Sequence, residues 1–475
     1  MAKTYLTLFI LLIISTQIKA QQYGLFNTRT LFDAFENPAQ PAFALDSSRQ
    51  YASNFLLPYF GLNAANKGES NYVLSDLINH GKYNTDNVPI GNNNRNKIYE
   101  NSNVYLLTFR IFQSYKYHKE LGFSWQVRTD GYADYTNETL VAFGDYSRFT
   151  SSQNGLFNGH GYGQSYHQFS MTYRENVDKR LSLGVKLSLL SGITYNKIDI
   201  TQSSIAVDPA TNALSVGLSG NYESNYLRAS ELSTKSFLPN FKNPGLSAGF
   251  GTTYNAKSGV TIIANVKDLG FIRWNKDSHS INIDNQEVTV AQDPSLIPTE
   301  GLVSQNTLDK ELENLFINSD KQKSFYTPTN AKADFLISKT FGSYKPNFIV
   351  SKNLFYAGGD VAFVNTMKFG QYSASLTPAY NMIGFMMLGL QGMYQTPNFE
   401  FFLGSDNLLR TAKIKQVASV SSGYTGASVY LGLAIKFGYV VEHPQNSSYM
   451  PGVGDGANET GFFHKLFRMF KKDGD

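Results

Sequence analysis

The chain has 475 residues, with 30 Tyr and 35 Phe but only 2 Trp, and 16% of its residues are charged. That charged fraction is well below the roughly 25% of ordinary soluble domains. The net charge of +4 comes from interspersed charges of both signs, so no basic stripe indicates nucleic-acid binding. The chain has no cysteine, which excludes disulfides, thiolate metal sites and a cysteine nucleophile.

The N-terminus has the layout of a cleaved secretory signal. Lys3 precedes the apolar run "YLTLFILLIIS", and Ala20 provides a small residue just before Gln21. We therefore expect residues 1–20 to be a signal peptide and the mature chain to begin at Gln21. A transmembrane anchor is the alternative, but the apolar run is shorter than the roughly 20 residues that a spanning helix needs.

The next segment, "TRTLFDAFENPAQPAFA" at residues 28–44, is compact and partly apolar. Its Asn37-Pro38-Ala39 sequence can neither continue a helix nor lie inside a central strand. What this segment does depends on the strands that follow it.

Long runs of alternating residues follow. In residues 428–440, Leu431, Leu433 and Ile435 fall on one face, and Ala434 and Lys436 fall on the other. A soluble β-sandwich and a transmembrane barrel both produce this alternation. The runs of about 9 to 14 residues and the aromatic residues at their ends favour the barrel, because sandwich strands cluster near five or six residues.

We predict a transmembrane antiparallel β-barrel of about fourteen strands within residues 48–440. The predicted strands lie near residues 51–60, 102–113, 118–131, 165–175, 180–195, 244–255, 258–275, 330–341, 345–352, 358–369, 371–381, 383–395, 397–404 and 427–440. The connections at 61–101, 132–164, 196–243 and 276–329 are long and the alternate ones are short. This asymmetry is typical of outer-membrane barrels with long external loops.

Residues suited to catalysis or metal binding are sparse. His160 and His167 come close in sequence without a nearby carboxylate at ligand spacing, so we expect no metal site and no cofactor. Asp277, Ser278 and His279 are consecutive and have the side chains of a hydrolase. Adjacent residues on a strand point to opposite faces, so they cannot act together, and we expect no catalytic residues and no enzyme. The segment 307–316 reads as a short helix packed over a loop or pore.

Beyond the last strand, residues 441–475 comprise a Pro- and Gly-rich linker and a short basic helix. The apolar face of this tail helix consists of Phe462, Phe463, Leu466, Phe467, Met469 and Phe470. We expect it in the periplasm, where it rests on the inner leaflet or docks into a partner's groove; a folded-back plug or a frayed tail is the alternative.

A lumen of about fourteen strands is wider than its own side chains can fill. We therefore expect residues 21–47 to fold into it as a hatch, with a disordered leader as the alternative. The hatch residues that we single out are Phe32, Asp33, Phe35, Glu36, Asn37, Pro38 and Ala39, of which Asp33, Glu36 and Asn37 are expected to meet lumenal Lys and Arg.

"LFDAFENPAQPAFA" just inside the mature N-terminus resembles the start of FadL-like outer-membrane barrels. "VKDLGFIRWN" at residues 266–275 and "GSDNLL" at residues 404–409 resemble segments of an uncharacterised family in the Bacteroidetes branch of that superfamily. The resemblance implies fourteen strands, an N-terminal hatch and the passage of hydrophobic molecules, and it includes relatives associated with type IX secretion.

These observations give three expectations for function in a Gram-negative outer membrane. The first is passive transport of hydrophobic or amphipathic small molecules, with membrane lipid and such a ligand as partners. The second is a non-enzymatic accessory subunit of an outer-membrane assembly or secretion complex, which binds a protein through its external loops or its tail. The third and most distant is a barrel-embedded lipid hydrolase.

Overall fold

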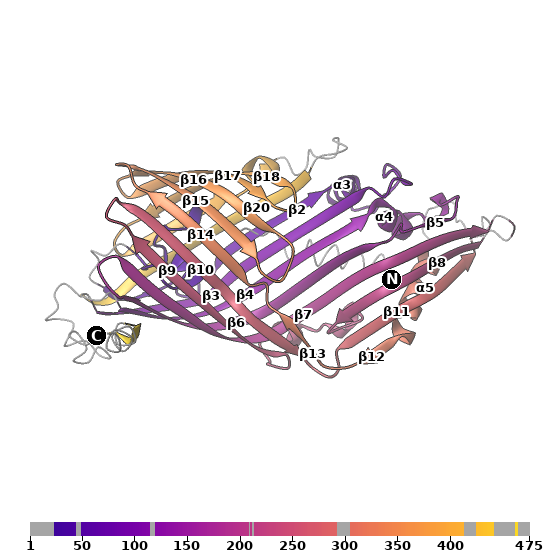
Figure 1. Cartoon of the computed structure of the whole chain (residues 1–475), viewed down its shortest axis with the longest axis horizontal. Coiled ribbons are helices and arrows are strands. Elements are labelled where there is room, and N and C mark those ends of the chain that lie inside the picture. The colour runs from indigo at the N-terminus through magenta and orange to yellow at the C-terminus, as the bar shows by residue number, and fades with distance from the viewer. Residues whose placement is uncertain are drawn as a thin grey trace, which may run out of the picture.

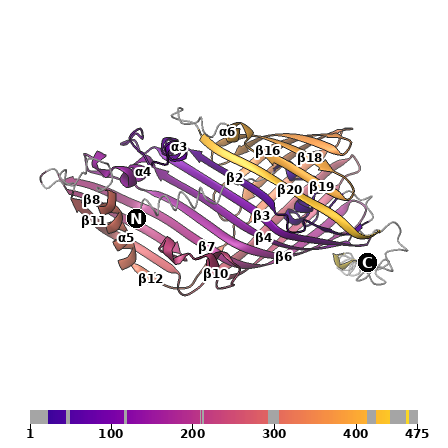
Figure 2. The same ribbon diagram turned by 180° about the vertical axis from the view of Figure 1, so that it is seen from behind.

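The structure is a computed structural model that describes residues 23–43, 49–114, 119–208, 210, 213–291, 305–412, 424–440 and 461–463. Its main feature is a closed antiparallel β-barrel (Figure 1, and from behind in Figure 2). Fourteen strands form the wall. The last of them, β20, pairs with the first wall strand and so closes the ring. Within the described residues, no helix is both long and apolar enough to cross a membrane.

The first wall strand has two parts, β1 and β2, which both lie between β20 and β3. The wall consists, in order, of β1 (Arg49–Ser53) with β2 (Tyr59–Lys67), β3 (Arg95–Ser114), β4 (Lys119–Thr136), β6 (Gly159–Asn176), β7 (Leu181–Asp208), β9 (Pro244–Asn255), β10 (Val260–Trp274), β14 (Lys332–Lys339) with β13 (Phe325–Pro328), β15 (Tyr344–Asn353), β16 (Gly359–Phe369), β17 (Tyr372–Asn381), β18 (Phe385–Gln395), β19 (Phe399–Ser405) and β20 (Tyr424–Val440).

One wall strand continues far beyond the barrel. The 28 residues of β7 exceed the roughly 9 to 11 that a tilted strand needs to cross a bilayer. The second half of β7 pairs with β8 (Ala213–Ser224), and β8 pairs with β11 (His279–Ala291). The short strands β5 (Gln153–Asn154) and β12 (Asp320–Gln322) extend this sheet. We call this part of the sheet the extension.

Helices cover the extension and complete an apolar core of its own. They are α3 (Ser70–His80), α4 (Asn137–Gly144) and α5 (Gln305–Asn318), with the 3-10 turn η2 (Tyr146–Arg148). Leu308 of α5 and Val141 of α4 are buried with Ile283 of β11 in this core. Figure 1 shows the extension at the end of the barrel opposite the C-terminus.

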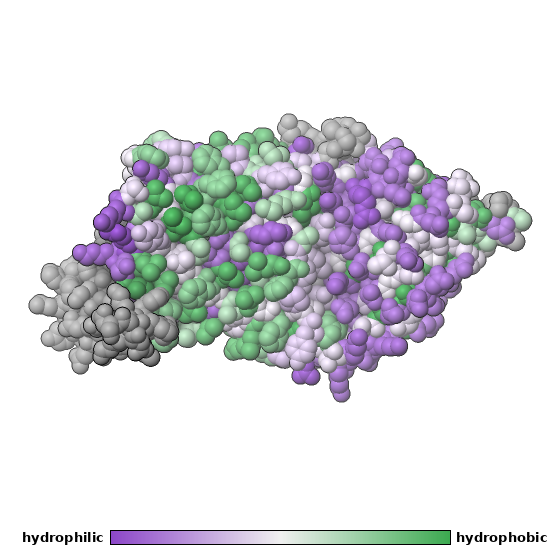
Figure 3. All heavy atoms as spheres, in the orientation of Figure 1, coloured by the Kyte–Doolittle hydropathy of each residue, from purple (hydrophilic) through white to green (hydrophobic). Residues whose placement is uncertain are grey.

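The two faces of the wall strands differ as period-two alternation requires. On β7, Lys186 and Ser188 are buried inside the barrel, whereas Leu187 and Leu189 are exposed on its outside. Figure 3 shows apolar residues gathered over the barrel and hydrophilic residues over the extension. An outward apolar band around a polar interior is the arrangement of a transmembrane barrel.

All fourteen predicted wall strands are present, and the predicted helix at 307–316 is part of α5. Two predictions need correction. The first strand is interrupted at residues 54–58, and the connections predicted as loops at 196–243 and 276–329 contain β8 and β11. Residues 1–20 and most of the predicted tail, including Leu466, Phe467, Met469 and Phe470, lie outside the described residues.

Candidate functional site

Residues 23–43, here called the N-terminal segment, contact the inner wall of the barrel. The segment contains the 3-10 turn η1 (Tyr23–Leu25) and helix α2 (Leu31–Glu36). Thr30 caps α2, since its hydroxyl accepts the N–H of Asp33 at 3.1 Å. The helix ends after Glu36 because Pro38 cannot continue it and disfavours helical geometry at Asn37.

Two wall glycines make room for the turn after α2. Asn37 Oδ1 accepts the N–H of Ala39 at 3.0 Å, which stabilises the turn locally. A Cβ atom on Gly184 of β7 would lie 2.1 Å from the Pro38 carbonyl, and one on Gly251 of β9 would lie 2.2 Å from Asn37 Oδ1. Gly184 and Gly251 are paired across the two strands, so the turn lies directly on the wall.

Aromatic rings hold the other side of α2. Phe32 stacks on Tyr59 of β2 with 3.9 Å between ring centroids, and it meets Tyr105 and Phe402 edge-on at 5.5 Å each. All four rings are buried. Edge-to-face and offset contacts of this kind add stability beyond the buried area.

Glu36, the last residue of α2, is bound by several groups of the wall. Its carboxylate pairs with Arg128 of β4 and lies 3.4 Å from Lys267 Nζ of β10. Asn103 Nδ2 and the Tyr105 hydroxyl donate to Oε1 at 2.7 and 2.8 Å. Burial opposes ionisation of Glu36, but Arg128 and then Lys267 outweigh it and hold the pKa of this carboxyl well below its usual range.

A β-bulge supplies two adjacent charges to the same network. Val266 pairs with Phe250 and Leu269 with Ala248, so Lys267 and Asp268 together face a single residue of β9. Asp268 has a φ of +56°, in the left-handed region that Asp adopts more readily than most residues. Both side chains are therefore buried inside the barrel, although neighbours on a regular strand alternate between faces.

These charges form one network across the lumen. Asp268 lies 2.8 Å from Arg128 Nη1 and 3.2 Å from Lys186 Nζ, and Lys267 lies 3.1 Å from Asp334 of β14. Buried charges at such distances fix geometry when every charge has a partner, and losing one partner is costly. The network thus fixes the position of α2 against β4, β7 and β10.

A second charged cluster holds the end of the N-terminal segment. Glu120 of β4 lies 2.7 Å from Arg110 Nε and 3.4 Å from Arg174 Nη1. The two arginines also donate to backbone carbonyls of the segment: Arg110 to Ala34 at 3.0 Å and Arg174 to Ala39 at 2.9 Å.

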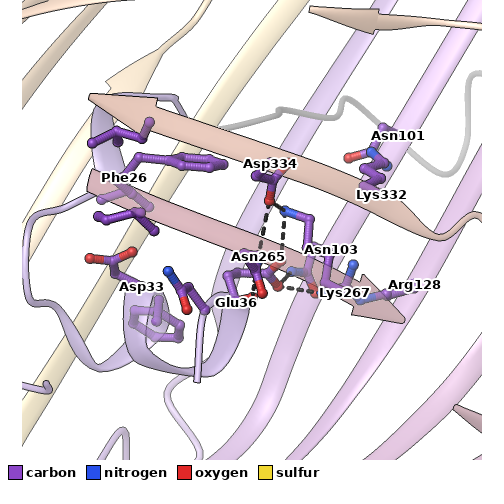
Figure 4. A pocket seen from close by; sticks show the side chains of 15 residues that line it. Phe26, Asp33, Glu36, Asn101, Asn103, Arg128, Asn265, Lys267, Lys332 and Asp334 are labelled. Atoms are coloured by element: carbon purple, nitrogen blue, oxygen red, sulfur yellow. Dashed lines mark hydrogen bonds and ion pairs between the residues drawn. The ribbon is translucent and has the colours of Figure 1, made fainter. Parts of the chain in front are cut away.

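A cavity of about 50 Å³ lies between α2 and the wall, with room for a few water molecules. In Figure 4, Glu36 and Asp33 approach it from the N-terminal segment, and Lys267, Asn265 and Asp334 approach it from β10 and β14. Leu25, Phe26, Phe32, Ile263 and Leu336 form its apolar lining. The cavity is therefore amphipathic, and Phe32 joins it to the aromatic cluster.

All seven residues singled out in the predicted hatch are placed in this segment. Glu36 meets lumenal cations, but the Asp33 carboxylate instead accepts the backbone N–H groups of Thr28 and Arg29 at 3.0 and 3.1 Å. Burial raises the pKa of Asp33 to about 6, although these backbone hydrogen bonds lower it. The Asn37 side chain binds its own turn.

Sequence reasoning did not single out the wall residues of the network as site residues. The alternation within 118–131 and 180–195 puts Arg128 and Lys186 on the polar faces of these predicted strands, which indicates the lumen. Asp268 gave no such signal, because a bulge breaks the alternation on which facing is read.

The other sequence features stay apart from this network. His279 lies 2.7 Å from Asp320 and 3.8 Å from Glu231 in the extension. His167 accepts from Trp125 Nε1 at 3.3 Å on the outer wall. In the described parts of the sequence, no group of three His, Asp or Glu side chains is arranged to hold a metal ion.

The fold and the charged lumen define a class: a transmembrane barrel whose interior contacts its own N-terminal segment. A family model described as a family of unknown function, DUF5723, matches residues 41–406. The chain belongs to this family. No curated protein matches it.

Three solved structures illustrate how far the likeness to known barrels goes. A TodX monoaromatic hydrocarbon channel mutant is 7% identical, with 85% of this chain and 94% of that chain covered and a TM-score of 0.42. The Pseudomonas putida toluene transporter TodX is 8% identical, with 86% and 94% covered and a TM-score of 0.38. A Pseudomonas aeruginosa FadL homologue is 9% identical, with 86% and 94% covered and a TM-score of 0.39. At these values, the function of this barrel has to be inferred from its own residues.

Proposed function

We propose that this protein is a Gram-negative outer-membrane barrel that passes hydrophobic or amphipathic small molecules passively, with the N-terminal segment as a hatch that closes its lumen. The outward apolar band supports the membrane location, since such a band is stable only against lipid or another apolar surface. It includes exposed Leu187, Phe250, Phe335 and Phe401 from four different strands.

The observation that carries this proposal is the interruption of the first wall strand. Residues 54–58 leave the ladder between Ser53, which pairs with Phe109 and Ile435, and Tyr59, which pairs with Tyr105. The Asn54 side chain bonds to the backbone of β3 in place of the ladder: its Oδ1 accepts the Thr108 N–H at 2.8 Å, and its Nδ2 lies 3.3 Å from the Leu106 carbonyl. The same Nδ2 also donates to the Leu57 carbonyl at 2.9 Å, within the interruption.

The interruption presents an apolar surface to the outside. Phe55, Leu56 and Leu57 are consecutive and exposed, and Leu56 retains 66% of its accessible surface. Three exposed apolar residues at a break in the wall suit a membrane-dissolved solute, which reaches the barrel from the side through lipid.

A short path of residues connects this break to the cavity. Tyr59 begins β2 directly after the break and stacks on Phe32, and Phe32 also lines the cavity on its other side. Movement of α2 away from the wall would therefore join the outer apolar surface to the amphipathic interior. The cavity of about 50 Å³ is too small for most such solutes while α2 is in place.

Deletion of residues 21–47 tests the hatch. The barrel should still fold, because its strands close the ring of hydrogen bonds without this segment. Uptake or leak of an amphipathic probe in liposomes should increase, while deletion of residues 441–475 should leave it unchanged. A folded barrel with unchanged flux after the first deletion would refute the hatch.

An accessory subunit of an outer-membrane assembly is the second candidate, and the extension favours it. Leu214 and Val216 of β8 and Ile281 of β11 build an apolar core that a passive channel does not require. If this candidate is correct, removing the tail or the tip of the extension should abolish co-purification of a protein partner, and the hatch deletion should not.

A further inference from the structure

The connection between β8 and β9, residues 225–243, folds back onto the outer wall of the barrel. His167 of β6 is 2.8 Å from the Phe237 carbonyl through Nε2, and the Phe241 N–H donates to Ser191 Oγ at 3.0 Å. Because Trp125 donates to His167 Nδ1, the neutral tautomer with a proton on Nε2 satisfies both contacts. The connection is thus fixed to β6 and β7.

This connection places apolar side chains on the outside of the barrel, directly before the start of β9. Phe237, Leu238 and Phe241 are all exposed, and the Phe241 ring lies 5.7 Å from Phe169 of β6. Leu246 of β9 and its cross-strand partner Phe271 are also exposed, and they extend this apolar surface along the wall.

Exposed cations lie close to these apolar residues along the chain and across the strand pairing. Lys235 lies in the 3-10 turn η4 (Thr234–Phe237), and Lys242 follows Phe241; both are exposed. Arg273 of β10 is exposed one residue beyond the Gly245–Ile272 register pair, next to the start of β9. Of the nearby acidic residues, Glu231 lies 3.8 Å from His279, and Asp277 is exposed at the end of the β10–β11 turn.

We infer that residues 235–242, with Arg273, bind the phosphorylated headgroup of an outer-leaflet lipid. The apolar side chains enter the acyl region, and Lys235, Lys242 and Arg273 meet the phosphate groups above it. Aromatic residues with cations at the bilayer boundary match the charge and polarity of an anionic interface. This inference rests on the proposed membrane location, not on transport.

The test compares substitutions at two pairs of lysines in the full-length protein: Lys235 with Lys242, and a control pair at the opposite rim. Protein from vesicles of phosphatidylcholine and lipid A is captured in mild detergent, and the lipid A retained per protein is measured. K235Q/K242Q should retain roughly 30-fold less lipid A than wild type, since each cation near an anionic surface contributes about fivefold. K235R/K242R should retain the wild-type amount.

K179Q/K257Q is the matched control, because it removes two exposed lysines from turns at the opposite rim. It should behave as wild type. Equal loss from both pairs, or loss from neither, would overturn the inference, and so would release of lipid A by inorganic phosphate at millimolar concentration. Failure of wild type to insert into the vesicles would instead contradict the proposed membrane location.

Discussion

Glu36 is the residue through which the N-terminal segment is most directly tied to the wall. It is the one carboxylate of α2 that contacts both Arg128 and Lys267. Without it, Arg128 keeps Asp268 and Lys267 keeps Asp334, so the barrel itself retains its charge pairs. Loss of Glu36 should therefore loosen α2 without unfolding the wall.

Glu36→Gln should weaken docking of α2 by roughly 3 kcal/mol, because it removes the charge from a buried pair. Since the chain has no cysteine, a single Ala34→Cys reporter on the buried side of α2 can measure this. A water-soluble thiol reagent should label it about 100-fold faster in the Glu36→Gln background. Glu287→Gln, on an exposed residue of β11, is the control. Equal labelling rates in both backgrounds would show that Glu36 does not hold α2.

The sequence indicates for most wall residues whether the side chain points into the lumen or outward, but it does not do so at the bulge. Strict alternation in the sequence puts Arg128 and Lys186 on the polar face, and both are buried inside the barrel. The same rule would put Lys267 and Asp268 on opposite faces, whereas both point inward. The left-handed φ of Asp268 depends on the pairing of β10 with β9, which no local pattern in the sequence reports.

At the scale of elements, periodicity was sufficient for the wall and insufficient outside it. Long alternating runs predicted all fourteen wall strands. The strands β8 and β11 also alternate, with Leu214, Val216 and Leu218 inward on β8, but they lie in connections whose length suggested loops. Bilayer thickness gives the expected length of a strand within the membrane, so it cannot indicate a sheet that continues beyond it.

The interruption between β1 and β2 gives a prediction for this element. Replacing Leu56 and Leu57 by Ser should lower the uptake of a hydrophobic probe several-fold, because the apolar entry surface becomes polar. The double variant should still fold, since both side chains are exposed and no packing inside the wall is lost. Leu354→Ser, at another exposed apolar position, is the matched control. If the control lowers uptake equally, the entry is not at the interruption.

At the scale of the whole molecule, the apolar band should determine how charge is tolerated. Leu187 on β7 and Leu409 on α6 (Leu408–Ala412) are exposed to the same degree, 55% and 56%. If Leu187 lies near the bilayer midplane, Leu187→Arg should lower the free energy of unfolding in lipid by about 2 to 4 kcal/mol. Leu409→Arg should lower it by about 1 kcal/mol or less. Similar losses at both positions would contradict the assigned band.

The central claim is that movement of the N-terminal segment opens the lumen, and a reversible crosslink tests it most directly. A Cβ atom on Gly251 would lie 3.3 Å from Ala39 Cβ, close to the roughly 3.5 to 4.5 Å of a disulfide. The Asn37 carboxamide must turn aside to admit it. With no native cysteine, Ala39→Cys/Gly251→Cys can form only this bond within the chain. Flux of an amphipathic probe through reconstituted protein should be low after oxidation and recover on reduction, with the Ala39→Cys single variant unaffected by either treatment. Equal flux in the oxidised and reduced states would contradict the account.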